Sequence, residues 1–76
     1  MKIEILGMGC PKCKNLYENA IKAAEEADVQ AEIIKVEDMA KITEYEVMIT
    51  PALVIDGEVK STGKVVPIDE IKKWIS

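Results

Sequence analysis

The chain has 76 residues, 49% of them apolar and 4% aromatic, and its 10 lysines against 14 aspartates and glutamates give a net charge of −4. A chain of this length is expected to form a single domain over residues 1–76. The acidic balance and the absence of arginine argue against a nucleic-acid partner, because neutralising phosphates requires a basic patch.

The sequence also argues against a membrane partner. No apolar run approaches the roughly 18 residues that a membrane span requires, and no charged segment followed by an apolar core opens the chain. We therefore expect a cytoplasmic protein, and a monomer, since nothing in the sequence demands a dimer. Cys10 and Cys13 are close in the sequence, and one such pair in a cytoplasmic chain indicates a redox or metal-binding site rather than a structural disulfide.

The first half of the chain predicts a strand, a helix and a second strand. Lys2–Leu6 alternates between polar and apolar residues and ends at a glycine, as a strand does. From Pro11 to about Ala27, apolar residues recur at helical spacing and predict one buried stripe. This stripe consists of Leu16, Tyr17, Ala20, Ile21, Ala24 and Ala27. Ala31–Val36 reads as the second strand, and a unit of this length forms a right-handed parallel crossover.

A short helix and a third strand follow. Asp38 has the side chain of an N-cap, and it precedes a short helical pattern that carries Met39, Ile42 and Tyr45. Pro51 cannot donate a hydrogen bond within a strand ladder, so it marks the entry to a strand at Ala52–Ile55.

The chain then turns back and closes on a helix. Asp56-Gly57 favours a tight hairpin turn into a fourth strand at Glu58–Ser61. Pro67 opens a last helix, which places apolar residues on one face. These residues are Ile68, Ile71 and Ile75. The predicted order of elements is therefore βαβαββα.

Both cysteines lie in the segment Gly7-Met8-Gly9-Cys10-Pro11-Lys12-Cys13, between the first strand and the first helix. Two thiols separated by two residues can close a small disulfide ring, and a helix start offers unpaired N–H groups to an ionised sulfur. Pro11 suits the first helical turn because its φ is already fixed. Lys12 is a candidate for stabilising a negative charge on Cys10, against the simpler interpretation of a solvated lysine.

This pattern resembles the thioredoxin-like superfamily, in particular its small glutaredoxin-sized archaeal and bacterial redox-active disulfide proteins. The resemblance rests on the element order, on Cys10-Pro11-Lys12-Cys13 directly after the first strand, and on Thr50-Pro51 directly before the third. It covers the whole chain. It implies an α/β, thioredoxin-like fold, in which helices flank a four-stranded mixed sheet of order 2-1-3-4.

The resemblance also implies site residues and their roles. Cys10 and Cys13 would form a redox-active disulfide, with Cys10 as the exposed nucleophile and Cys13 as the buried resolving thiol. A cis-proline at Pro51 would lie beside them, and Thr50 and Pro51 would receive the substrate. The implied activity is thiol-disulfide exchange, as a protein-disulfide reductase or electron carrier that needs no cofactor. Its partners would be protein disulfides and an unidentified reductase.

A metal-binding alternative shares the same segment. Gly7 to Cys13 also fits the Gly-Met-x-Cys-x-x-Cys loop of heavy-metal-associated domains, in which two thiolates, here Cys10 and Cys13, bind a soft ion such as Cu(I). Those domains have the order βαββαβ and end on a strand, whereas this sequence predicts a closing helix. A zinc site is disfavoured, because the chain has no histidine and no third cysteine. An inert structural disulfide is the remaining alternative.

Overall fold

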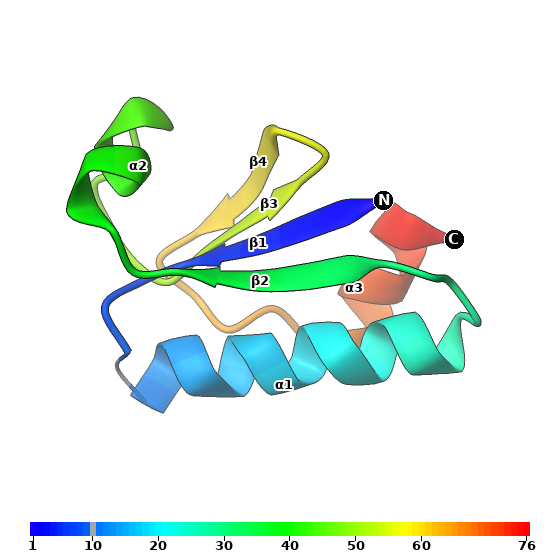
Figure 1. Ribbon diagram of the computed structural model, residues 1–76. Coiled ribbons are helices and arrows are strands. Elements are labelled where there is room, and N and C mark those ends of the chain that lie inside the picture. The colour runs from blue at the N-terminus through cyan, green and yellow to red at the C-terminus, as the bar shows by residue number, and fades with distance from the viewer. Residues whose placement is uncertain (10) are drawn as a thin grey trace.

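The computed structural model describes residues 1–9 and 11–76. Its elements follow the predicted order (Figure 1): β1 Lys2–Leu6, α1 Pro11–Glu26, β2 Glu32–Val36, α2 Met39–Glu44, β3 Ala52–Ile55, β4 Glu58–Thr62 and α3 Ile68–Ile75. Among these residues no helix is both long enough and apolar enough to cross a membrane.

The four strands form one mixed sheet in the order β2-β1-β3-β4. β1 pairs in parallel with β2 and antiparallel with β3, and β3 pairs antiparallel with β4. The sheet order 2-1-3-4 expected from the sequence is confirmed. Because β1 has a strand on each side, the end of β1 is a firmly held starting point for the loop that leads to the cysteines.

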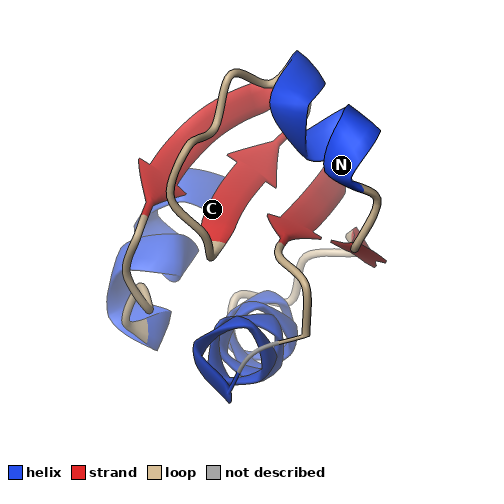
Figure 2. Cartoon of the chain, turned by 90° about the vertical axis from the view of Figure 1, so that its left-hand side faces the viewer, coloured by secondary structure: helices blue, strands red, loops and turns tan. Residues whose placement is uncertain are grey.

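The helices cover the two faces of the sheet unequally. α1 and α3 lie on one face and α2 lies on the other, with α1 seen along its axis in Figure 2. The larger core, under α1 and α3, is built around Ile3, Ile5, Leu16, Leu53 and Ile71. The smaller core, under α2, consists of Leu6, Val36, Ile42, Ala52 and Val54. Successive residues of a strand thus point into opposite cores, because side chains in a β-strand alternate between the two faces of the sheet.

The buried face of α1 differs in part from the predicted stripe. Ala23, absent from the prediction, is fully buried, whereas Tyr17, Ile21 and Ala27 are only partly buried. The reason is that α1 packs against α3 as well as against the sheet, which rotates and widens its buried face. Cys13, at the start of the helix, is also buried.

Several boundaries shift by one residue. β2 begins at Glu32, whose N–H donates to the Met1 carbonyl at 2.9 Å, and not at Ala31. Tyr45 is the C-cap of α2 and not its last helical residue. Pro67 is likewise the N-cap of α3, with extended backbone angles. These differences lie at element ends, where hydrogen bonding and not sequence pattern decides the boundary.

Asp56 and Gly57 form the hairpin turn between β3 and β4. Both have positive φ, 49° and 84°, as a two-residue turn of the I′ type requires. Asp56 also secures the N-terminal end of β1. Its N–H donates to the Lys2 carbonyl at 2.8 Å, and its Oδ1 accepts from the Lys2 N–H at 2.8 Å.

Candidate active site

Cys13 lies in the first turn of α1, where the helix meets the end of β1. Its side chain is 6% exposed, whereas Pro11 and Lys12 beside it are exposed. The burial expected for the second cysteine is therefore observed. Cys10 lies outside the described residues, so its exposure and its disulfide with Cys13 stay predictions.

Gly7 is the immediate neighbour of the Cys13 sulfur. A Cβ added at Gly7 would overlap Cys13 Sγ and would come within 3.2 Å of Cys13 Cβ. The Gly7 N–H donates to the Val36 carbonyl at 3.0 Å and so extends the β1–β2 ladder by one residue. Gly7 is thus a fixed surface against which the sulfur packs. The sequence predicted Gly7 as the end of a strand and as part of the segment that holds the cysteines, but not as a contact of the Cys13 sulfur.

Val36 pairs with one edge of the Gly7 backbone. Thr50 and Pro51 lie along the other edge, next to the pair of Leu6 and Ala52. The Thr50–Pro51 peptide bond is cis. Pro51 is fully buried and its carbonyl accepts from the Gly63 N–H at 2.8 Å, while Thr50 is exposed. The Thr50 Cβ lies 3.8 Å from the position of a Cβ built on Gly7. The structure therefore brings Thr50 to the same glycine that contacts Cys13.

Exposed apolar side chains adjoin both sides of this meeting point. Met8, next to Gly7, is 59% exposed; Met48 and Ile49, just before Thr50, are 95% and 62% exposed. Single exposed apolar residues are common on protein surfaces. Three of them on the two segments that meet at Gly7 make this part of the surface suitable for an apolar partner.

A cavity of about 240 Å³ opens beside Cys13. It is lined by Ile5, Gly7, Gly9, Cys13, Lys14, Lys35 and Glu37. The Lys35 ammonium lies 4.5 Å from the ring centroid of Tyr17 on α1, a cation–π contact that holds it at this face of the sheet. The buried sulfur therefore borders a polar space that carries charges of both signs.

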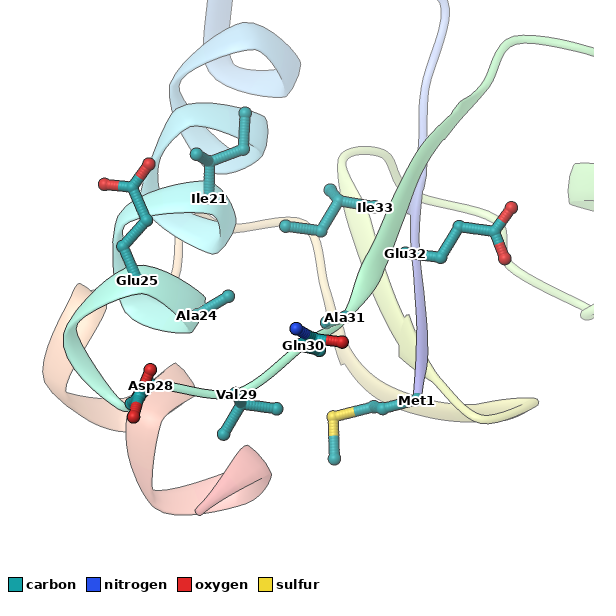
Figure 3. Close-up of a pocket in the computed structure, with 10 residues that line it drawn as sticks. All are labelled: Met1, Ile21, Ala24, Glu25, Asp28, Val29, Gln30, Ala31, Glu32 and Ile33. Carbon is teal, nitrogen blue, oxygen red and sulfur yellow. The ribbon is translucent and has the colours of Figure 1, made fainter.

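A larger cavity of about 730 Å³ lies elsewhere (Figure 3). It runs between the C-terminal part of α1 and the start of β2, where Ile33 points toward the helix. Its lining contains neither Cys13 nor any residue of the loop that leads to α1. Figure 1 shows β2 beginning beside the C-terminal end of α1, whereas Cys13 lies in the first turn of that helix. The position of Cys13, and not cavity size, therefore locates the candidate site.

Glu4 is a nearly buried carboxylate on the central strand, 8% exposed. The Tyr45 hydroxyl donates to both of its oxygens at 3.1 Å, and Lys2 Nζ lies 3.7 Å from Oε1. Burial, followed by the hydrogen bond to the Glu4 carboxylate, raises the pKa of the Tyr45 hydroxyl above its usual value. This pair lies on the α2 side of the sheet, away from the Cys13 cavity.

The described part of the chain contains no group of three or more histidine, cysteine, aspartate or glutamate side chains arranged to hold a metal ion. The two-thiolate alternative also involves Cys10, which lies outside the described residues.

Known proteins resemble this chain over its full length. Residues 1–76 match the model of a family described as thioredoxin domain. The chain belongs to this family. A thioredoxin from Methanocaldococcus jannaschii is 45% identical over 71 residues, which cover 93% of this chain and 81% of that protein. A thioredoxin from Methanothermobacter thermautotrophicus is 42% identical over 76 residues, 100% of this chain and 99% of that protein. Membership supports thiol-disulfide oxidoreductase chemistry.

Proposed function

We propose that this thioredoxin-domain protein is a dithiol carrier that reduces disulfide bonds in other proteins through Cys10 and Cys13. The observation that carries the proposal is the placement of Cys13, buried against Gly7 at the start of a helix. A buried second sulfur is shielded from partner disulfides, and Cys10 precedes it by only three residues in the sequence. That asymmetry is what a resolving thiol needs.

The reaction proceeds by two exchanges. The Cys10 thiolate attacks one sulfur of a partner disulfide, and the other partner sulfur leaves with the electron pair. Cys13 then attacks Cys10 Sγ, the Cys10–partner bond breaks, and the partner leaves fully reduced. Two electrons pass to the partner, and the carrier is left with a Cys10–Cys13 disulfide. A reductase of unidentified kind returns the pair to the dithiol state.

Thr50 and Pro51 form the docking site for the partner in this proposal. Thr50 is exposed, and Thr50 and Cys13 both lie near the position of a Cβ built on Gly7, so a partner segment beside Thr50 would reach the cysteines. Met8, Met48 and Ile49 would contact apolar side chains next to the partner's cysteine. Methionine side chains adapt to many shapes, which favours broad specificity.

The residues between the cysteines, the net charge and the cellular setting complete the proposal. Pro11 shapes the first turn of α1, and the exposed ammonium of Lys12 supports an ionised Cys10. The net charge of −4 favours protein partners over nucleic acid. We propose action as a monomer in the cytoplasm, where a reductase can keep the pair reduced.

A trapping experiment tests these roles. The Cys13→Ser variant should form a stable mixed disulfide with a protein substrate such as insulin, because attack is intact and resolution is lost. The Cys10→Ser variant should form none, and the unmodified protein should turn over without accumulating the intermediate. Trapping by Cys10→Ser would reverse the assigned roles. Tight one-to-one Cu(I) binding without reductase turnover in the unmodified protein would replace the proposal with metal carriage.

A further inference from the structure

The outer edge of β2 has no neighbouring strand among the described residues. The sheet order β2-β1-β3-β4 leaves β2 with a partner on one side. The Glu32 N–H and the Val36 carbonyl form hydrogen bonds of 2.9 and 3.0 Å on the β1 side. Because the N–H and C=O groups of successive strand residues point to opposite sides, those of Ile33 and Lys35 point to the open side. Such an edge is a template for pairing with another chain.

An apolar groove adjoins this edge (Figure 3). It is the cavity of about 730 Å³ between the C-terminal part of α1 and the start of β2. Ile33 points from β2 toward the helix, and Ile21 lines the groove from α1. Both side chains, and that of Val29 between the two elements, are only partly buried. The volume lies within the roughly 300–1,000 Å³ of ligand pockets, so the groove has room for apolar side chains of a segment that pairs with the edge.

The side-chain charges around the groove are negative. Glu25, Asp28 and Glu32 are exposed and belong to its lining, and none of the described lining residues is a lysine. Glu25 lies in the last turn of α1, where the helix dipole favours a cation. The neighbouring Glu26 is paired with Lys72 Nζ at 3.3 Å, whereas no ion pair among the described residues involves Glu25. The groove is therefore complementary to a basic partner.

We propose that this edge and groove bind an extended segment of a partner protein in which apolar residues alternate with lysine or arginine. The segment adds to β2 as a fifth strand and pairs with the backbone of Ile33 and Lys35. Its apolar side chains turn toward α1 and enter the groove. The basic side chains turn to the other face of the strand, where Glu32 lies, and one at the end of the segment meets Glu25.

The proposed surface is separate from the cysteines and goes beyond the carrier function proposed above. Glu25 lies about three helical turns, roughly 18 Å, beyond Cys13 along α1. The thiol end of the helix carries the exposed Lys12 and Lys14, so a basic segment is favoured at the groove and disfavoured beside the thiols. A partner docked at the β2 edge would therefore hold the protein while leaving its cysteines accessible.

A titration with a short peptide tests this binding. The probe is Val-Lys-Val-Lys-Val-Lys, acetylated and amidated at its ends, added to the full-length, isotope-labelled, reduced protein. In two-dimensional NMR spectra the amide signals of Ile33 and Lys35 should shift in a saturable way. The matching peptide with glutamate in place of each lysine has the same backbone and apolar residues. It should leave these signals unchanged, because the carboxylates at the groove repel it.

Two matched double variants test the contribution of charge. Glu25→Gln with Glu32→Gln should weaken peptide binding about three- to fivefold at low salt, as expected for the loss of two exposed ion pairs. The difference should shrink as salt is added. Glu44→Gln with Glu46→Gln makes the same change in net charge at exposed positions outside the groove. This control should bind the peptide as the unmodified protein does.

Modified peptides test the strand pairing itself. One version carries N-methyl groups on its valines and the other on its lysines, so each lacks the N–H groups of alternate residues. Only one of these two sets faces β2 in an added strand. One version should therefore lose binding while the other keeps most of it, whatever the direction of the segment. Equal binding by the two versions would overturn the pairing with β2.

The other outcomes are equally distinct. Unshifted Ile33 and Lys35 signals, or equal weakening by the Glu44 and Glu46 variant, would overturn the proposal. The same shifts on adding spermidine would show a site for simple cations. Shifts that grow with protein concentration alone would show that a second copy of this chain occupies the edge. Each of these results would reject the docking surface and leave the carrier function untouched, because the cysteines take no part in the measurement.

Discussion

The sulfur of Cys13 lies against Gly7 so closely that a single added carbon at position 7 would overlap it. Gly7 cannot easily move away, because its N–H is bound to the Val36 carbonyl at 3.0 Å. The requirement for glycine here is one of space. The position of Cys13 therefore depends on a backbone surface that belongs to the sheet and not to the helix that carries the thiol.

Replacing Gly7 by alanine should displace Cys13 and destabilise the fold. Overpacking of a buried contact typically costs about 1–3 kcal/mol, so the free energy of unfolding should fall by roughly that amount. Dithiodipyridine, a small disulfide, should release one thiopyridone on attack by Cys10 and a second on resolution by Cys13. The second release should slow as well, because the added carbon displaces the Cys13 sulfur. Urea unfolding followed by circular dichroism measures the first effect, and stopped-flow absorbance measures the second.

Gly57→Ala is the matched control for this substitution. Gly57 has a φ of 84° and no heavy atom within 4 Å of an added Cβ, so alanine there meets strain but no collision. It should cost roughly 1–2 kcal/mol and leave the rate per folded molecule unchanged. Gly7→Ala with normal stability and normal resolution would show that Cys13 does not need this contact.

The elements of this fold were predictable because each rests on a short-range pattern. The alternation over Lys2–Leu6 and the helical spacing after Pro11 both lie within one element and need no knowledge of its neighbours. The contact of Gly7 with Cys13 depends instead on how α1 leaves β1. That contact leaves no local signal in the sequence.

The apolar surface beside Thr50 should govern the binding of protein substrates. Replacing Met48 and Ile49 together by serine should raise KM for insulin severalfold, because exposed side chains that contact a partner lose their apolar area. The two residues are exposed, so the free energy of unfolding should change little. Steady-state insulin reduction measures the effect.

Dithiodipyridine provides the control for this double substitution, since it is too small to span the surface. Both of its release phases should keep their rates. If the rates with the small disulfide fell as much as those with insulin, the substitution would have disturbed the cysteines and not the docking of partners.

Removing the Tyr45 hydroxyl should destabilise the protein in a pH-dependent way. Burial and the Glu4 hydrogen bond raise the pKa of Tyr45, so the neutral phenol is favoured in the folded state. Its contribution is fully present below about pH 10, the usual value, and is lost as the pH rises through the raised value. Tyr45→Phe should therefore lower the free energy of unfolding at pH 7, and by a smaller amount once the pH has risen well above about 10.

Tyr17→Phe is the control, because the Tyr17 ring contacts Lys35 and phenylalanine keeps a ring there. Its stability should stay near that of the unmodified protein at every pH. Urea titrations at pH 7 and above pH 10 make the comparison. A Tyr45→Phe deficit that grows with rising pH would contradict the direction of the pKa change.

Glu4 shows why a correct strand assignment did not reveal a buried charge. A charged residue between apolar ones in a strand usually faces solvent, yet Glu4 is 8% exposed. β1 is central, and α2 with its C-cap Tyr45 lies over that face. The alternation identifies which face a residue is on, but what covers that face is decided by a segment about forty residues later.

The short helix α2 should depend on its cap more than a longer helix does. Asp38 Oδ1 accepts from the Ala40 N–H at 2.9 Å, and α2 has only 6 residues. Asp38→Ala should cost about 1 kcal/mol. In Asp38→Ala the amide hydrogens of α2 should exchange faster, because the helix has lost its cap. The increase should be larger than for β1, which contacts α2 only through the packing of Ile42 over Leu6 and Val36.

Asp69→Ala tests whether this effect belongs to the cap or merely to a negative charge near a helix start. Asp69 is exposed in the first turn of α3, where the N-cap Pro67 makes no side-chain hydrogen bond. Its loss removes only the interaction with the helix dipole, about 0.3–1 kcal/mol. Hydrogen exchange should therefore leave α3 almost unchanged in Asp69→Ala and accelerate α2 selectively in Asp38→Ala. Equal acceleration in the two helices would show that charge, and not the capping hydrogen bond, stabilises α2.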